Sequence, residues 1–202
     1  ADGPVIQSAA TKALKNGMTL SKLFAQLGEI KNQVDIPLVM MGYLNVIMYY
    51  GIEKFFKSCA DNGASGCIIP DLPFKDYLEV VKPIADKYDI RVIMMITPET
   101  SEERIRFIDD NTDGFIYMVS SASITGAQSN FNDDKVAYFE RINAMNLKTP
   151  RMIGFGISNK QTLESAQNNA SGAIIGSKFV TLLNETGNPD LAIDKLYDAL
   201  KK

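Results

Sequence analysis

The chain has 202 residues, a formal net charge of −3 at pH 7, two cysteines and no histidine. This length fits one domain with a sizeable core, and the mild negative charge gives no indication of a nucleic-acid or anionic-membrane partner. The absence of histidine excludes Ser-His-Asp and Cys-His catalysis and most zinc chemistry, so acid–base work falls to Asp, Glu, Tyr or Lys.

The first predicted element is a helix. Apolar residues recur with helical spacing from Val5 to Leu14, and Pro4 suits the first turn. Asp2-Gly3 precedes this helix like a loop at the carboxyl end of a strand that these residues do not include. A second amphipathic helix is predicted over Leu20–Ile30.

Six short apolar runs are predicted to be strands. They are nearly continuous rather than alternating, which is typical of parallel strands buried on both faces. The runs are Ile36–Met41, Gly66–Pro70, Arg91–Thr97, Gly114–Val119, Met152–Phe155 and Ala173–Gly176. Because helical patterns separate them, the sequence predicts an α/β fold with a parallel sheet, either a closed barrel or an open doubly wound sheet.

The helical patterns between the strands carry apolar stripes, such as Ile52–Cys59 and Phe74–Val81, which we interpret as core-facing. Pro83 predicts a kink or a broken turn. Helix starts are predicted from three signals: Thr100-x-x-Glu103, Ser158-x-x-Gln161 and Asn188-Pro189.

Cys59 and Cys67 both lie among apolar residues, with no further candidate ligands nearby. We expect them to be reduced packing residues rather than a disulfide or a metal site, which favours the cytoplasm. No signal peptide is visible, and no apolar run reaches the roughly 18 residues of a membrane span.

Two glycine turns near the C-terminus carry the clearest functional signal. They are Gly154-Phe155-Gly156-Ile157-Ser158 and Gly172-Ala173-Ile174-Ile175-Gly176-Ser177. Each turn ends an apolar run and opens a helical pattern, as the last two β/α turns of a (β/α)₈ barrel do when they bind phosphate. The alternative is that the glycines only allow a strand and a helix to pack closely.

The number of strands differs from that of a closed barrel, which needs eight. An open six-stranded sheet would expose two apolar edges. We therefore expect residues 1–202 to form a single barrel domain of the phosphate-binding type, a TIM barrel that lacks its first two strands.

The order of motifs resembles that of tryptophan synthase α subunits over the whole chain. The matching motifs are Ala1-Asp2-Gly3-Pro4-Val5-Ile6-Gln7, Gly42-Tyr43-Leu44-Asn45, Pro70-Asp71-Leu72-Pro73, Thr125-Gly126-Ala127, Gly154-Phe155-Gly156-Ile157-Ser158 and Gly176-Ser177. The first motif and the Gly-Phe-Gly-Ile-Ser turn are specific, whereas the others are weaker alone. The resemblance implies a cofactor-free lyase of tryptophan biosynthesis that cleaves indole-3-glycerol phosphate to indole and glyceraldehyde 3-phosphate.

The resemblance also implies roles for individual residues. Asp2 matches the family's catalytic aspartate, which binds the indole N1–H; otherwise it is a helix-start residue. The family's second catalytic group is a glutamate at the end of the second strand, which has no counterpart here, so we expect these 202 residues to be inactive or nearly so. Tyr117 matches a tyrosine that lines the substrate site.

The segment Ser120–Phe131 has the composition of a mobile loop and resembles the family's active-site lid. Within it, Thr125 is expected to bond the catalytic aspartate and Gly126 to line the phosphate site. Ser121 stands where many relatives carry arginine, which changes the closing interactions.

The remaining implied positions form three groups. The phosphate site comprises Gly126, Phe155, Gly156, Gly176 and Ser177; the apolar walls of the indole pocket are Met41 and Ile68; and the face toward the family's β subunit carries Asn45 and Asp71. The β subunit, which forms an α₂β₂ heterotetramer with the α subunit, supplies pyridoxal phosphate, and no metal or cofactor is expected in this chain. Asp71 has an alternative role as a loop cap, and the two walls are equally well explained as core.

Two other functions stay open. A sibling phosphate-binding barrel, such as indole-glycerol-phosphate synthase or phosphoribosylanthranilate isomerase, would share the glycine turns but not the first motif or Thr125-Gly126. A non-enzymatic chain would bind only phosphate ligands or a β-type partner. Release of indole from indole-3-glycerol phosphate distinguishes an active lyase from such a binding protein.

Overall fold

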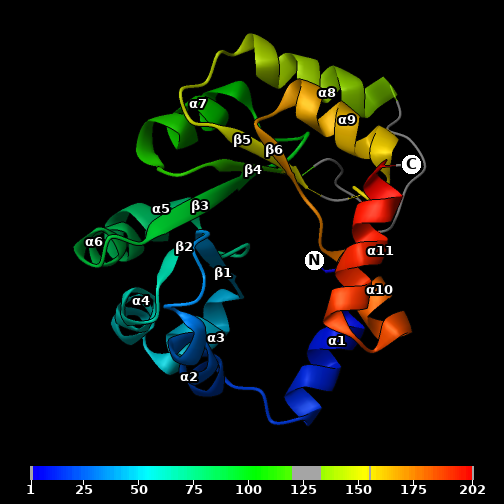
Figure 1. Cartoon of the computed structure of the whole chain (residues 1–202). Helices are drawn as coiled ribbons and strands as arrows, with labels where there is room; N and C mark the ends of the chain where they lie inside the picture. Colours follow the sequence, from blue (N-terminus) through cyan, green and yellow to red (C-terminus); the bar gives the residue numbers. More distant parts are fainter. Residues whose placement is uncertain (1, 120–132, 155, 202) are drawn as a thin grey trace. The chain divides into compact units, whose positions relative to one another are not determined.

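The structure is a computed structural model that describes residues 2–119, 133–154 and 156–201 (Figure 1). Its internal contacts divide the chain into two compact units. Unit 1 comprises Ala1–Lys15, Met95–Asp109 and Ile116–Lys202, and unit 2 comprises Asn16–Met94 and Asp110–Phe115. The single barrel domain expected from the sequence stays a prediction.

Unit 2 is built on parallel strands. Strand β1 (Leu38–Met41) pairs with β2 (Ala64–Ile68), and β2 pairs with β3 (Arg91–Ile96), whose last two residues belong to unit 1. The helices of this unit are α2 (Leu20–Ile30), α3 (Leu44–Tyr50), α4 (Ile52–Asp61), α5 (Phe74–Asp76), the π-helical turn η1 (Tyr77–Val81) and α6 (Lys82–Lys87). Each predicted strand of unit 2 is therefore confirmed, with small shifts of its ends.

The apolar stripe of α4 packs into the core of unit 2, as predicted. Phe55, Phe56 and Cys59 are buried, and α4 contacts β2. Cys59 and Cys67 are both free and buried, which confirms their role as packing residues. Burial also raises the pKa of both thiols, so neither is a reactive thiolate at neutral pH.

The predicted break at Pro83 is confirmed. The π-helical turn η1 precedes Pro83, and the regular helix α6 restarts with Pro83 in its first turn. Proline lacks an N–H group and is tolerated only at the start of a helix, so the chain widens into a π turn before it.

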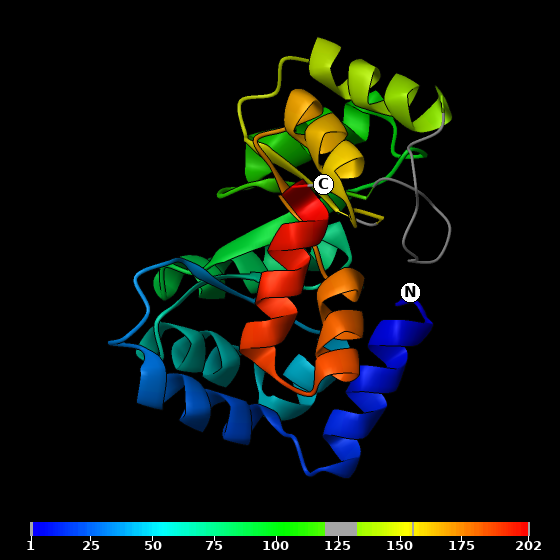
Figure 2. The same ribbon diagram turned by 45° about the vertical axis from the view of Figure 1, so that its right-hand side comes forward.

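Unit 1 holds the second parallel ladder, in which β4 (Ile116–Val119) pairs with β5 (Arg151–Gly154) and β5 pairs with β6 (Gly172–Ile174). Its helices are α1 (Pro4–Lys15), α8 (Asp133–Ala144), α9 (Lys160–Asn169), α10 (Ser177–Thr186), α11 (Pro189–Lys201) and most of α7 (Glu102–Asn111). Helices α8 and α9 lie side by side (Figure 1), and α10 packs between α1 and α11 (Figure 2).

Two of the three predicted helix starts are wrong by one residue. Helix α7 is capped by the hydroxyl of Ser101 instead of Thr100, and α9 has its capping box at Asn159 and Thr162 instead of Ser158 and Gln161. Serine, threonine and asparagine all cap helices, so neighbouring candidates cannot be separated by residue type. The third start is confirmed, because Asn188 caps α11 and accepts a hydrogen bond from the Leu191 N–H.

Asp109 anchors the segment between α8 and β5. This residue is 8% exposed, and its carboxylate accepts hydrogen bonds from the backbone N–H groups of Lys148 and Thr149 at 3.0 and 2.8 Å. Burial by itself would raise the pKa of Asp109, but hydrogen bonds from Thr149 and Lys148 outweigh burial and lower the pKa. The charged form is therefore the one that stabilises the fold.

We expect Asp109→Asn to lower the free energy of unfolding by about 2 kcal/mol at neutral pH, because two charge-assisted bonds are weakened. A depressed pKa means that this stabilisation is present above the ordinary aspartate pKa, about 3.9, and is lost as the pH falls through the folded-state pKa. Urea unfolding at neutral pH and in acid measures both effects. The exposed Asp194→Asn serves as the control, and an equal loss for the two variants would contradict the prediction.

Among the described residues, no helix combines the length and apolar character needed to cross a membrane. In the same part of the chain, no three His, Cys, Asp or Glu side chains gather as a possible metal site.

Candidate active site

Several predicted site residues of unit 1 lie within or shortly after its strands. Tyr117 is in β4, Gly156 follows β5, and Gly176-Ser177 follow β6 at the start of α10. The strands are parallel, so their carboxyl ends meet at one edge of the ladder. The ladder therefore brings Gly156 and Gly176-Ser177 to one edge, and Tyr117 lies two residues before the carboxyl end of β4.

Tyr117 packs directly against Gly154, a contact that the sequence did not reveal. The side chain of Tyr117 is 5% exposed, and a methyl group added to Gly154 would overlap its ring and hydroxyl oxygen. Gly154 lies in register with Val119 of β4 and with Ile174 of β6. Glycine is therefore needed at position 154 for the tyrosine ring to occupy its place.

Asp2 is close enough to Tyr117 for its charge to act on the phenol. Burial first, and then the negative charge of Asp2, raise the pKa of Tyr117, so the phenol stays protonated at neutral pH. Asp2 is half-buried, and its backbone carbonyl accepts a hydrogen bond of 2.7 Å from the Gln7 side chain. The fold thus brings together the first helix and strand β4, which are more than a hundred residues apart.

The turn after β5 uses its own side chains to cap the next helix. Gly156 has a φ of 86°, which favours glycine because other residues are strained there. The Thr162 hydroxyl accepts hydrogen bonds from the N–H groups of Ser158 and Asn159, and Asn159 in turn accepts one from the Thr162 N–H. These donors at the start of α9 are already satisfied within the chain.

The turn after β6 differs, because the capping residue of α10 is Gly176, which has no side-chain acceptor. The first N–H groups of a helix have no partner within the helix. Gly176 is exposed, and a methyl group added to it would meet no heavy atom within 4 Å. The start of α10 is thus an accessible helix N-terminus with the properties of an anion site.

In unit 2, Met41 and Ile68 end adjacent strands in register with each other. Ile68 is buried at 6% exposure, which agrees with its alternative role as core, whereas Met41 is 52% exposed. An exposed methionine at the carboxyl end of a strand is available to contact a ligand or another chain.

Asp71 links two loops of unit 2. Its carboxylate accepts a hydrogen bond of 2.8 Å from the Leu44 N–H, at the start of α3. Tyr43, the residue before α3, provides no side-chain cap, so Asp71 acts as the cap from 27 residues away. Asn45 lies exposed in the first turn of α3, next to this bond. One carboxylate oxygen of Asp71 is thus engaged within the chain.

The segment Ser120–Phe131, predicted to be a lid, and Ala1 of the first motif lie outside the described residues, and so do four positions with implied roles. These four positions are Ser121, Thr125, Gly126 and Phe155.

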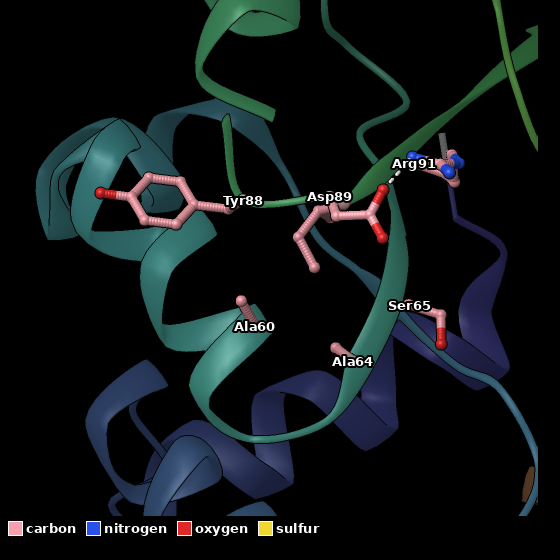
Figure 3. Close-up of a pocket in the computed structure, with 7 residues that line it drawn as sticks. Ala60, Ala64, Ser65, Tyr88, Asp89 and Arg91 are labelled. Atoms are coloured by element: carbon pink, nitrogen blue, oxygen red, sulfur yellow. Dashed lines mark hydrogen bonds and ion pairs between the residues drawn. The ribbon is translucent and has the colours of Figure 1, made fainter. Parts of the chain in front are cut away.

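A cavity of about 370 Å³ lies at the amino ends of β2 and β3, away from the carboxyl ends that carry the predicted site residues (Figure 3). It is lined by Ala60, Ala64, Ser65, Tyr88, Asp89, Ile90 and Arg91. Asp89 and Arg91 point toward each other and form an ion pair of 2.7 Å, so their charges offset each other. None of the predicted site residues lines this cavity, and the amino ends of barrel strands are associated with stability rather than catalysis.

In a comparison with known sequences, residues 1–201 match the family described as Tryptophan synthase alpha chain. A tryptophan synthase alpha chain from Phocaeicola vulgatus is 67% identical over 202 residues, which make up 100% of this chain and 78% of the relative. The corresponding protein from Parabacteroides distasonis is 63% identical over all of this chain and 79% of its own length.

Solved structures agree with this match. A mutant tryptophan synthase alpha-subunit from Pyrococcus furiosus has a TM-score of 0.87 at 28% identity, over 98% of this chain and 80% of the other. A chain of the tryptophan synthase complex from the same organism has a TM-score of 0.86, also at 28% identity, over 100% and 79% of the two chains. The similarity confirms the predicted fold class, and the described residues form six parallel strands of a TIM barrel.

Proposed function

Because the chain belongs to the tryptophan synthase alpha chain family, we propose that its strand ends bind and cleave indole-3-glycerol phosphate. Members of this family are carbon–carbon lyases of tryptophan biosynthesis. The observation that carries the site assignment is the cluster at the strand ends of unit 1, where Asp2 acts on Tyr117 and an accessible helix N-terminus begins at Gly176.

The proposed reaction is a retro-aldol cleavage. A base removes the proton of the side-chain hydroxyl next to the breaking bond, and a proton is delivered to C3 of the indole ring. The electron pair of the broken carbon–carbon bond returns to the ring, so indole and glyceraldehyde 3-phosphate leave without any oxidation or reduction. Carboxyl groups can perform these proton transfers, which suits a chain with no histidine.

Asp2 is proposed to accept a hydrogen bond from the indole N1–H. Its negative charge then stabilises the positive charge that develops on the ring. Tyr117 is proposed to line the substrate site as a neutral phenol, which its raised pKa favours. Gly154 supports this role, because it leaves the space that the ring needs.

The phosphate is proposed to bind at the helix start after β6. The Ser177 hydroxyl and the first N–H groups of α10 are suitable donors, and Gly176 leaves them accessible. Phe155, Gly156 and Gly126 are proposed to complete the site, and Thr125 to bond Asp2 when the lid closes. Met41 and Ile68 are the proposed apolar walls for the indole ring.

Indole is proposed to pass to a β-type partner chain, which carries pyridoxal phosphate and forms an α₂β₂ assembly with this chain. Asn45, exposed on α3, is proposed to face that partner, together with the loop that contains Asp71. The lyase reaction itself needs no cofactor. The two reduced cysteines suit a cytoplasmic location.

We also infer that a polypeptide of only these 202 residues cleaves the substrate slowly or not at all. It holds no counterpart of the glutamate that the family resemblance places at the end of the second strand. Loss of that group alone removes the general acid–base step, which typically contributes about 10²–10⁴ in rate.

Calorimetric titration with indole-3-glycerol phosphate, combined with an assay for released indole, tests both proposals. Binding with release supports the lyase and overturns the inferred impairment, whereas binding without release supports the impairment. Absence of binding overturns the proposed site. Where indole is released, we expect Asp2→Asn to lower kcat by about 10²–10³ while KM changes little. The exposed Asp35→Asn is the matched control.

A further inference from the structure

Arg141 of α8 holds the loop that follows β3. Its two terminal nitrogens donate hydrogen bonds to the backbone carbonyls of Pro98, at 2.8 Å, and Thr100, at 3.3 Å. These carbonyls lie more than 40 residues away in the sequence, in the segment 97–101 that joins β3 to α7. The planar guanidinium suits this task because its donors form a rigid fork.

The loop itself is ordered by local bonds. The Thr97 N–H donates to the Thr100 hydroxyl at 2.9 Å, the Thr100 N–H donates to the Thr97 carbonyl at 3.0 Å, and Ser101 caps α7. The segment is thus a compact turn with its own internal bonds. The bonds within the turn hold its own shape, but they do not attach it to another element. The two hydrogen bonds from Arg141 attach the turn to α8.

Arg141 is in turn held by its neighbour on the helix. Its guanidinium carbon lies 5.6 Å from the centre of the Tyr138 ring, one turn earlier in α8. Tyr138 is 4% exposed and packs against Phe139, which is fully buried. An arginine that contacts an aromatic ring and two carbonyls has little freedom to change rotamer. The contact is therefore preorganised within unit 1.

We propose that Arg141 is a positioning residue for the substrate site, acting through the loop of residues 97–101. This inference rests on the proposed function, which places binding at the carboxyl ends of the strands, where this loop begins. A loop that leaves its place reduces the fraction of molecules competent to bind, and the apparent affinity falls by that fraction. Arg141 itself is not proposed to touch the substrate.

Arg106 provides a control for Arg141, because its contact lies at the amino end of a strand. Arg106 of α7 also donates to a backbone carbonyl, that of Met145, at 3.3 Å. Met145 lies in the segment between α8 and β5, before the strand begins. Loss of Arg106 therefore removes a comparable contact in the same unit, without affecting a loop at the carboxyl end of a strand.

The test compares Arg141→Met with Arg106→Met by calorimetric titration with indole-3-glycerol phosphate. We expect Arg141→Met to raise the dissociation constant about tenfold, or about 1.4 kcal/mol, and Arg106→Met to change it less than about twofold. Arg141→Lys, which keeps the charge but not the fork, should lie between wild type and Arg141→Met. Equal dissociation constants for the two methionine variants would overturn the proposal.

Amide hydrogen exchange tests the positioning role of Arg141 independently of substrate binding, and so independently of the proposed function. We expect the amides of the segment 97–101 to exchange faster in Arg141→Met than in Arg106→Met, at similar urea midpoints. If the wild type does not bind the substrate, the proposed function fails, and exchange then decides whether Arg141 holds the loop. Unchanged exchange in Arg141→Met would overturn the positioning role whether or not the substrate binds.

Discussion

Gly154→Ala is expected to destabilise unit 1 by about 1–3 kcal/mol and to abolish most substrate binding. The added methyl group would occupy the place of the Tyr117 ring, which is buried. Either the Tyr117 ring or the backbone of β5 must then move. Both are parts of the candidate site, so substrate binding is affected as well. Urea unfolding and calorimetric titration with indole-3-glycerol phosphate measure the two effects.

The cause is tested by a second substitution. Tyr117→Leu removes the ring atoms that the new methyl group would meet, so Gly154→Ala should cost far less stability in a Tyr117→Leu background than in the wild type. This coupling is the signature of two residues in direct contact. Additive losses of stability would contradict the prediction. Gly17→Ala is not a suitable control, because Gly17 has a φ of 75° and would be strained for another reason.

Gly176→Asp is expected to strengthen helix α10 and to destroy phosphate binding. A carboxylate at this position would lie at the positive end of the α10 dipole, which stabilises a helix by about 0.3–1 kcal/mol. The same carboxylate would occupy the proposed phosphate position and repel a phosphate by about 4 kcal/mol at 4 Å. We therefore expect the dissociation constant for indole-3-glycerol phosphate to rise by at least about a hundredfold.

Gly176→Ala separates charge from side-chain size. Gly176 has a φ of −108°, and nothing within 4 Å would meet an added methyl group, so alanine should fold normally. Its dissociation constant should stay within about tenfold of the wild type. Stable folding of both variants with unchanged affinity for the aspartate variant would exclude this helix start as the phosphate site.

The elements themselves follow from local pattern. All six predicted strands are present, and the helices begin close to the predicted positions, because apolar spacing and start signals are properties of neighbouring residues. The exact caps do not follow in this way, because Ser101 and Asn159 cap the helices that Thr100 and Ser158 were predicted to cap. Several adjacent residues could cap each helix, and the choice depends on which side chain reaches the backbone after the turn has formed.

Contacts between distant segments could not be read from the sequence. The sequence assigns Gly154 a role in its own turn, yet its tightest constraint is the ring of Tyr117 on the neighbouring strand. Asp71 caps a helix that begins 27 residues earlier, and Arg141 holds a loop more than 40 residues earlier. For the contact between Gly154 and Tyr117, the sequence offered a single signal. Gly154 ends one predicted strand, and the preceding predicted strand carries the aromatic Tyr117.

The order of strands and helices, the reduced state of the cysteines, the exclusion of histidine chemistry and the family resemblance all follow from the residues alone. They depend on residue type and on short-range spacing, which the chain carries before it folds. Tertiary structure decided which glycine turn presents an uncapped helix start, which residue excludes a side chain at Gly154, and which arginine holds the loop after β3. These features arise from close packing and from hydrogen bonds between segments far apart in the chain, and only the folded backbone brings such segments within reach.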